Sequence, residues 1–210
     1  MNNTINALTA LVKNYKDTPS GLLDELIELF DRQDDFLDKV KKFDKLFLKY
    51  TEFNEIQEYA FDLLMSHHLD NNQEDEDYFE SREWMDIEDS TLERGTELLN
   101  MLLYITEAND NGVEMELGDF LNEFLLVDYD EFQDEHAIYE GLISNQELVE
   151  EDDNIIIEAS RNIKADDELK DLILPLFLFF SDPEHIKPGV VLDKIKPVER
   201  AVYMSMMAYA

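Results

Sequence analysis

The sequence predicts an all-α fold: a single-domain bundle of about eight to ten short helices with a strongly acidic surface. Apolar residues recur at the 3.6-residue helical period along nearly the whole chain. Hydrophobic residues make up 44% and aromatic residues 11% of the chain, which is enough to build a core. The acidic residues alternate with apolar ones, as in residues 123–128, and are not gathered in a separate tail. This pattern favours a folded protein over a disordered acidic one.

The N-terminal region, residues 1–50, is nearly neutral, with 8 Lys and Arg against 9 Asp and Glu. Three amphipathic helices are expected here, and Thr18 and Pro19 fit the N-cap and first position of the second one. Their apolar faces are formed by Ile5, Leu8, Leu11, Val12 and Tyr15, by Leu22, Leu23, Leu26, Ile27 and Phe30, and by Phe36, Val40, Phe43, Phe47 and Tyr50.

The middle region, residues 51–160, continues the helical pattern. A helix from Thr51 is followed by an exposed acidic loop at 70–77, because that stretch has no apolar residue. Ser90 and Glu93 fit a capping box that opens a helix burying Leu92 and Leu99. Gly112 is expected to end that helix. Two further helices, at 117–125 and 130–143, and a second acidic break at 150–154 complete the region.

The C-terminal region, residues 161–210, holds 7 Lys and Arg against 8 Asp and Glu. From Asp166 it becomes strongly apolar, and Pro175 should kink or split the helix expected there. A last helix starts after Pro197. The methionines near its end are a candidate homodimer contact, with burial in the core as the alternative: Met204, Met206 and Met207.

The charge of the chain is concentrated in the middle region. Only two of the 17 basic residues, Arg82 and Arg94, lie within residues 51–160, together with 34 of the 51 acidic ones. This region therefore carries a net charge of −32 out of −34. A net charge this large, concentrated in one part of the sequence, affects solubility and the choice of binding partners more than it affects the fold.

The sequence gives no catalytic, cofactor or metal site that we would nominate. It has no cysteine, which excludes disulfides and thiolate metal sites. His67 and His68 are adjacent, so on a helix they point too far apart to share a metal. His136 has Gln133 where a di-iron bundle needs Glu. We therefore expect a non-enzymatic protein without a cofactor.

The cellular location follows from what the chain lacks. The N-terminus shows no secretory signal. The longest apolar run, residues 172–180, is far shorter than the roughly 20 residues that span a bilayer. We expect a cytoplasmic protein that does not bind membranes.

Three explanations of the acidic region compete. One is mimicry of nucleic acid, which would occlude a basic DNA- or RNA-binding surface of a partner. A net charge of 32 equals that of about 54 Å of duplex, whereas a 210-residue domain is about 40–45 Å across. The second is a dedicated acidic partner for one basic protein: an immunity protein, an antitoxin or a chaperone. The third is solubility alone.

In charge and helix content the chain resembles DNA-mimic inhibitors such as phage anti-restriction and anti-CRISPR proteins, although no motif carries the resemblance. This resemblance implies an origin in a phage or mobile element. The expected partner is a basic nucleic-acid-binding protein or nuclease, with no direct binding of nucleic acid. Trp84, the only tryptophan, is either a half-buried anchor or a contact for the partner.

The candidate partner-binding residues are chosen by the density of acidic side chains. They are Glu74, Asp75, Glu76, Asp77, Asp86, Glu88, Asp89, Glu114, Glu116, Asp119, Asp128, Asp130, Glu131, Asp134, Glu135, Glu150, Glu151, Asp152 and Asp153.

Overall fold

The computed structural model describes residues 3–16, 21–72, 78–92, 94–124, 132–164, 169–181 and 191–210. These residues form eleven α-helices and three short 3-10 helices, with no strand among them. The all-α prediction is confirmed, with slightly more helices than expected. In chain order they are α1 (Asn3–Tyr15), α2 (Leu22–Asp31), α3 (Phe36–Lys49), η1 (Thr51–Ile56), α4 (Gln57–Asp70), η2 (Tyr78–Glu80), α5 (Arg82–Thr91), α6 (Leu98–Asn111), α7 (Leu117–Phe124), α8 (Phe132–Ile143), η3 (Gln146–Glu150), α9 (Asp153–Ser160), α10 (Ile173–Phe180) and α12 (Pro197–Tyr209).

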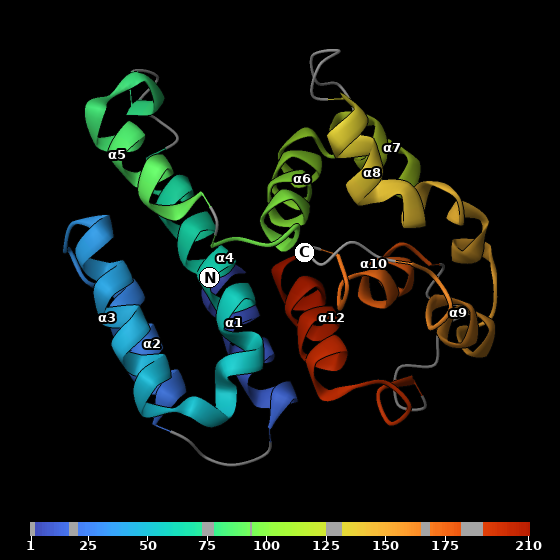
Figure 1. The fold of residues 1–210 in the computed structure, drawn as a ribbon, viewed down its shortest axis with the longest axis horizontal. Helices are drawn as coiled ribbons and strands as arrows, with labels where there is room; N and C mark the ends of the chain where they lie inside the picture. Colours follow the sequence, from blue (N-terminus) through green and yellow to red (C-terminus); the bar gives the residue numbers. More distant parts are fainter. Residues whose placement is uncertain are drawn as a thin grey trace.

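The first and last helices, α1 and α12, pack against each other near the centre of the molecule (Figure 1). They run antiparallel: Ser205 Oγ donates to the carbonyl of Ala7 at 3.1 Å, and Arg200 Nε donates to the carbonyl of Asn14 at 2.8 Å. The buried hydroxyl of Tyr209 lies 3.0 Å from the hydroxyls of both Ser66 and Thr106. These contacts join α12 to α4 and α6.

The helices lie in two groups on either side of this central pair. In Figure 1, α2 and α3 form a hairpin on the left with α4 and α5 beside it, and α7 to α10 lie on the right. Helix α4 packs against α1 and α6, and α10 packs against α12 and α9. One continuous hydrophobic core runs through residues from all three sequence regions.

The junction between α5 and α6 differs from the prediction. Ser90 lies inside α5 and does not cap a new helix, and α6 begins only at Leu98. The N-cap of α5 is Ser81, whose hydroxyl accepts from the amide of Trp84 at 3.1 Å. As a result Leu92, which we expected in the core, lies in the connection with 80% of its surface exposed. The capping-box spacing was misleading because α5 continues through Ser90 to Thr91, and Glu93 lies outside the described residues.

Two further local predictions have different outcomes. Helix α6 ends at Asn111 as expected, and Gly112 follows with a left-handed φ of 63°, which glycine adopts without strain. Pro175, which we expected to kink or split a helix, lies in the first turn of α10, which begins at Ile173. A proline is tolerated at the first turn of a helix, so α10 continues past it.

The methionine-rich end of α12 belongs mainly to the core. Met206 is fully buried and Met204 packs against the core, whereas Met207 is about half exposed. Core burial, the alternative to a homodimer contact, therefore holds for Met206. Within the described part of the chain, no helix combines the length and the apolar character that crossing a bilayer requires.

Candidate functional site

The ion pairs of the described residues divide the chain into two kinds of surface. We call residues 51–160 the acidic block, and residues 1–50 and 161–210 the flanks. Every Lys or Arg ion pair between described residues uses a carboxylate from the flanks. Even Arg94, one of the two cations in the acidic block, pairs with Asp44 of α3. The described carboxylates of the block therefore remain unneutralised by these cations.

Arg94 has a structural role. Both terminal nitrogens of its guanidinium donate to the carboxylate of Asp44, and the guanidinium lies 4.7 Å from the centre of the Phe61 ring. This fork-like pairing suits arginine, and stacking on an aromatic face adds to it. Arg94 thus fastens the α5–α6 connection to α3 and α4.

The structure tests the exposure of part of the predicted surface. Glu74 to Asp77, Asp128, Asp130 and Glu131 lie outside the described residues, and for Asp134 and Glu135 only the backbone in α8 is described. Asp153 is 4% exposed, so it cannot serve as a surface contact in this conformation. Its place at the start of α9 turns it inward, a feature that the density of acidic residues could not reveal. The remaining nine are exposed: Asp86, Glu88, Asp89, Glu114, Glu116, Asp119, Glu150, Glu151 and Asp152.

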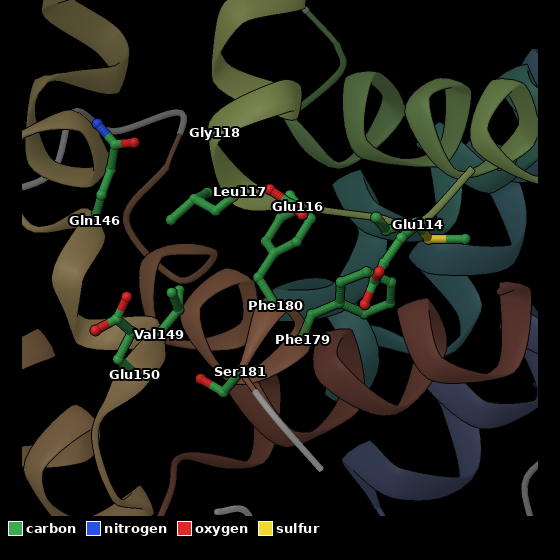
Figure 2. Close-up of a pocket in the computed structure, with 11 residues that line it drawn as sticks. Glu114, Glu116, Leu117, Gly118, Gln146, Val149, Glu150, Phe179, Phe180 and Ser181 are labelled. Atoms are coloured by element: carbon green, nitrogen blue, oxygen red, sulfur yellow. The ribbon is translucent and has the colours of Figure 1, made fainter.

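Two stretches of the predicted surface come together around one hollow, which we call the acidic hollow (Figure 2). It has a volume of about 830 Å³ and is lined by Glu114 and Glu116 from the α6–α7 connection and by Glu150 from η3. Phe179 and Phe180, at the end of α10, contribute its apolar part. Residues 36 positions apart in sequence thus present their carboxylates to the same space.

The connection that carries these glutamates is held in place by Tyr104. The Tyr104 hydroxyl donates to the carbonyl of Glu116 at 3.1 Å and accepts from the amide of Glu116 at 3.0 Å. The Tyr104 ring packs edge-on against Phe120, with centroids 5.5 Å apart. The backbone beneath the carboxylate of Glu116 is therefore fixed by a buried side chain from α6.

The predicted residues on α5 lie elsewhere. Asp86, Glu88 and Asp89 are exposed on α5, which lies at the opposite side of Figure 1 from α7 and α9. Their helix is capped by Ser81 and packs on the core through Ile87. The candidate surface therefore has two separate parts, the α5 carboxylates (Asp86, Glu88 and Asp89) and the acidic hollow.

Carboxyl groups are also buried inside the acidic block. Asp62 is fully buried and accepts from the amide of Thr96 at 3.1 Å and from the Thr96 hydroxyl. Burial raises its pKa well above the usual value, against the effect of these hydrogen bonds. A Cβ on Gly95 would lie 3.1 Å from the Asp62 carboxylate, so glycine permits this close approach. Nearby, the Glu97 carboxylate accepts from Tyr139 and Asn100.

The acidic block also contains a close pair of like charges. Burial, and after it the neighbouring carboxyl of Glu107 on α6, raises the pKa of Glu123 on α7. A nearby carboxylate disfavours ionisation of a second one. Part of this shift therefore comes from the crowding of acidic groups in the block.

The histidines of α4 are packing residues. The His67 ring stacks on Phe30, and the His68 ring lies 4.3 Å from that of Phe36 and is hydrogen-bonded to Tyr78 at 2.6 Å. Over the ranges that the structure describes, no cluster of three or more His, Asp or Glu could hold a metal ion. Comparisons with protein-family models, curated protein sequences and solved structures find no match for this chain.

One feature escaped the sequence argument: an apolar groove between α4, α5 and α6, lined by Trp84 and Leu92 among others. We considered Trp84 as a possible partner contact because of its acidic neighbours. Leu92 could not be found in this way, since the helical period placed it in the core.

Proposed function

We propose that this chain is an acidic interaction protein that covers a basic nucleic-acid-binding surface of a partner protein by presenting a similar density of negative charge. One observation carries the proposal. The nine exposed carboxylates described above have no ion pair with any described Lys or Arg, whereas seven flank carboxylates, among them Glu25, Asp34 and Asp171, do. Basic residues of a partner would complete these missing pairs.

The positions of the carboxylates suit this role because they stand on ordered elements. The α5 carboxylates belong to a capped helix, and Tyr104 fixes the backbone of Glu116. A preorganised set of charges loses less conformational entropy on binding than a flexible acidic tail. Release of condensed counterions would favour association, as it does for DNA.

The repulsion within the acidic block supports the same proposal. Like charges held together destabilise the folded chain, and the carboxyl of Glu107 adds to the effect of burial in raising the pKa of Glu123. A surface needed only for solubility would gain little from such crowding. A basic partner would relieve it, and charge complementarity would also speed association.

A competition assay tests the proposal. Proteins from a cell lysate are bound to immobilised duplex DNA at low salt, and the purified chain is then added in excess. We expect it to displace a small set of basic proteins and to form a complex with them in solution. The chain itself should not be retained on the DNA. Displacement of nothing would leave solubility as the explanation.

A pair of matched variants shows whether position or total charge matters. The triple variant D86N/E88Q/D89N removes three negative charges from the acidic block, and D24N/D31N/D35N removes three exposed ones from the flank. Displacement should weaken with the first variant and stay nearly unchanged with the second. Equal effects would mean that only net charge acts, which contradicts a defined binding surface.

A further inference from the structure

The apolar groove between α4, α5 and α6 is a second surface feature of the acidic block. It has a volume of about 460 Å³, and its apolar lining includes Met65 of α4, Phe79 of η2, Trp84 of α5, Leu92 of the connection, and Leu99 and Leu103 of α6. Its lining residues come from α4, η2, α5, the α5–α6 connection and α6, and none of them lines the acidic hollow. It is therefore separate from the acidic hollow.

The groove leaves large apolar side chains in contact with water. Phe79 is 44% exposed and Leu92 is 80% exposed. Single exposed apolar residues are common, but a contiguous group that lines a concave surface marks an interaction site. The exposed lining indicates that a ligand with apolar side chains would be stabilised here.

The wall formed by Trp84 is ordered before any ligand binds. Its ring packs edge-on against Phe79, with centroids 5.2 Å apart, and lies 5.9 Å from Tyr78. Ser81 caps the helix at the Trp84 amide. Tyr78 in turn is hydrogen-bonded to His68 of α4. A preformed aromatic wall of this kind is typical of binding hot spots.

The acidic residues at the rim of the groove favour a positively charged ligand. Glu88 lines the groove, and Asp89, the next residue of α5, is exposed, whereas Asp86 lines another hollow, beside α3. Of the two cations in the acidic block, Arg94 is committed to Asp44 and Phe61. A second copy of this chain would bring its own net charge of −34 to this rim, so repulsion opposes a homodimer there.

We propose that the apolar groove binds an amphipathic helix rich in Lys and Arg from the partner. Its apolar side chains would contact Trp84, Leu92 and Leu103, and its cations would face Glu88 and Asp89. A groove between helices suits a helix with anchors at i, i+3, i+4 and i+7. This inference rests on the proposed function and specifies it, because it requires an apolar segment beside the basic surface of the partner.

A synthetic peptide of 18 residues, with Leu at i, i+3, i+4 and i+7 and Lys elsewhere, tests the groove in the full chain. The control peptide has the same composition in an order without helical periodicity. Trp84 is the only tryptophan, so its fluorescence reports directly on the groove. The ordered peptide should bind at least tenfold more tightly by calorimetry and shift the emission of Trp84, whereas the control peptide should not shift it.

Two leucines with similar exposure provide the matched variants. Leu92 is 80% exposed in the groove, and Leu48 is 77% exposed on α3. Because neither side chain belongs to the core, Leu92→Ser and Leu48→Ser should both fold, as circular dichroism can check. We expect Leu92→Ser to weaken the ordered peptide at least fivefold and Leu48→Ser to leave its affinity unchanged.

The outcomes separate this inference from the proposed function. Equal, salt-sensitive binding of both peptides would overturn the groove inference while the acidic surface stands. Binding of neither peptide at low salt would overturn both. A wild-type dimer in sedimentation that Leu92→Ser converts to a monomer would show that a second copy covers the groove, and would overturn the inference as well.

Discussion

The flanks and the acidic block use charge in opposite ways. In the flanks, Lys49 bonds to Glu25 at 2.6 Å and Lys196 to Asp171 at 2.9 Å, linking different parts of the chain. In the acidic block, most described carboxylates are exposed without such a partner, and the buried Asp62 is bonded to the neutral donors of Thr96. The same residue types thus hold helices together in one region and remain available in the other.

The fold is stabilised mainly by apolar packing and only weakly by these surface ion pairs. Helices α1 and α12, one from each flank, pack together at the centre, and the helices of the acidic block attach to them through buried apolar side chains. Ion pairs at the surface contribute little, typically under about 1 kcal/mol. Substitutions that remove charges from the acidic block should therefore cost little in the free energy of unfolding.

The largest expected effect concerns binding of a partner isolated by displacement from DNA. For a protein that makes six to ten charge contacts, affinity should fall by about 10³–10⁵ between 50 and 200 mM salt. The variant D86N/E88Q/D89N/E114Q/E116Q/E150Q should lower the slope of log K against log salt by up to about five, since each contact contributes about 0.9.

Titration calorimetry at several salt concentrations measures this slope. The variant should also keep or increase its free energy of unfolding, because repulsion is removed. A slope that stays as steep as in the wild type would place the contacts outside the α5 carboxylates and the acidic hollow.

The next effect concerns the cation that joins the two regions. Replacing Arg94 by Met removes the paired hydrogen bonds to Asp44 and the contact with Phe61. We expect a loss of about 1–2 kcal/mol in the free energy of unfolding, from the ion pair and the cation–π contact together. Urea denaturation measures it.

Lys41→Met is the control for Arg94, because Lys41 and Asp38 form an exposed pair within one helix. That change should cost less than about 0.5 kcal/mol. Equal losses in the two variants would mean that Arg94 does not fasten the α5–α6 connection.

Much of the fold was predictable because helical periodicity is a local property. The core positions of α7 follow directly from the spacing of Leu117, Phe120 and Leu121, all of which are buried, and Gly112 ends α6 as expected. The α5–α6 junction was not predictable in this way. Its geometry depends on two tertiary contacts, of Thr96 with Asp62 and of Arg94 with Asp44, which sequence periodicity does not contain.

The candidate site was also only partly predictable from the sequence. Composition identified an acidic region, and most of its described carboxylates are exposed. Composition could not show that Glu114 and Glu150 would share a hollow or that Asp153 would be buried. Both outcomes depend on how α7, η3 and α9 pack against α10. This packing cannot be predicted from the density of acidic residues.

A third prediction uses the buried carboxyl of the acidic block. Because burial raises the pKa of Asp62 in the folded state, the folded chain binds more protons there than the unfolded chain. Stability should therefore rise as pH falls through the folded pKa toward the unfolded value near 3.8, by at most about 1.4 kcal/mol per pH unit.

The substitution Asp62→Asn isolates this contribution. The amide oxygen can still accept from the Thr96 amide, and the side chain no longer titrates. The variant should gain stability relative to wild type at pH 8, and the difference should shrink toward pH 4. His67 and His68, whose pKa values are lowered by burial, act in the opposite direction but are common to both proteins. A difference that does not depend on pH would contradict a raised pKa.

The smallest expected effect is on the free energy of unfolding. Neutralising one glutamate should raise it in the acidic block and lower it in the flank. Glu123→Gln removes one member of the like-charge pair with Glu107, so at pH 7 it should stabilise the fold by about 0.5 kcal/mol or less. Glu25→Gln removes a carboxylate whose pKa is lowered by hydrogen bonds from Lys49 and Tyr50, so it should destabilise the fold.

Thermal unfolding at pH 7 and pH 4 measures both changes in stability. The two changes should converge toward wild type at the lower pH, where both carboxyls are largely protonated in the unfolded chain. If both variants shifted stability in the same direction at pH 7, total charge and not local pairing would govern the two regions alike.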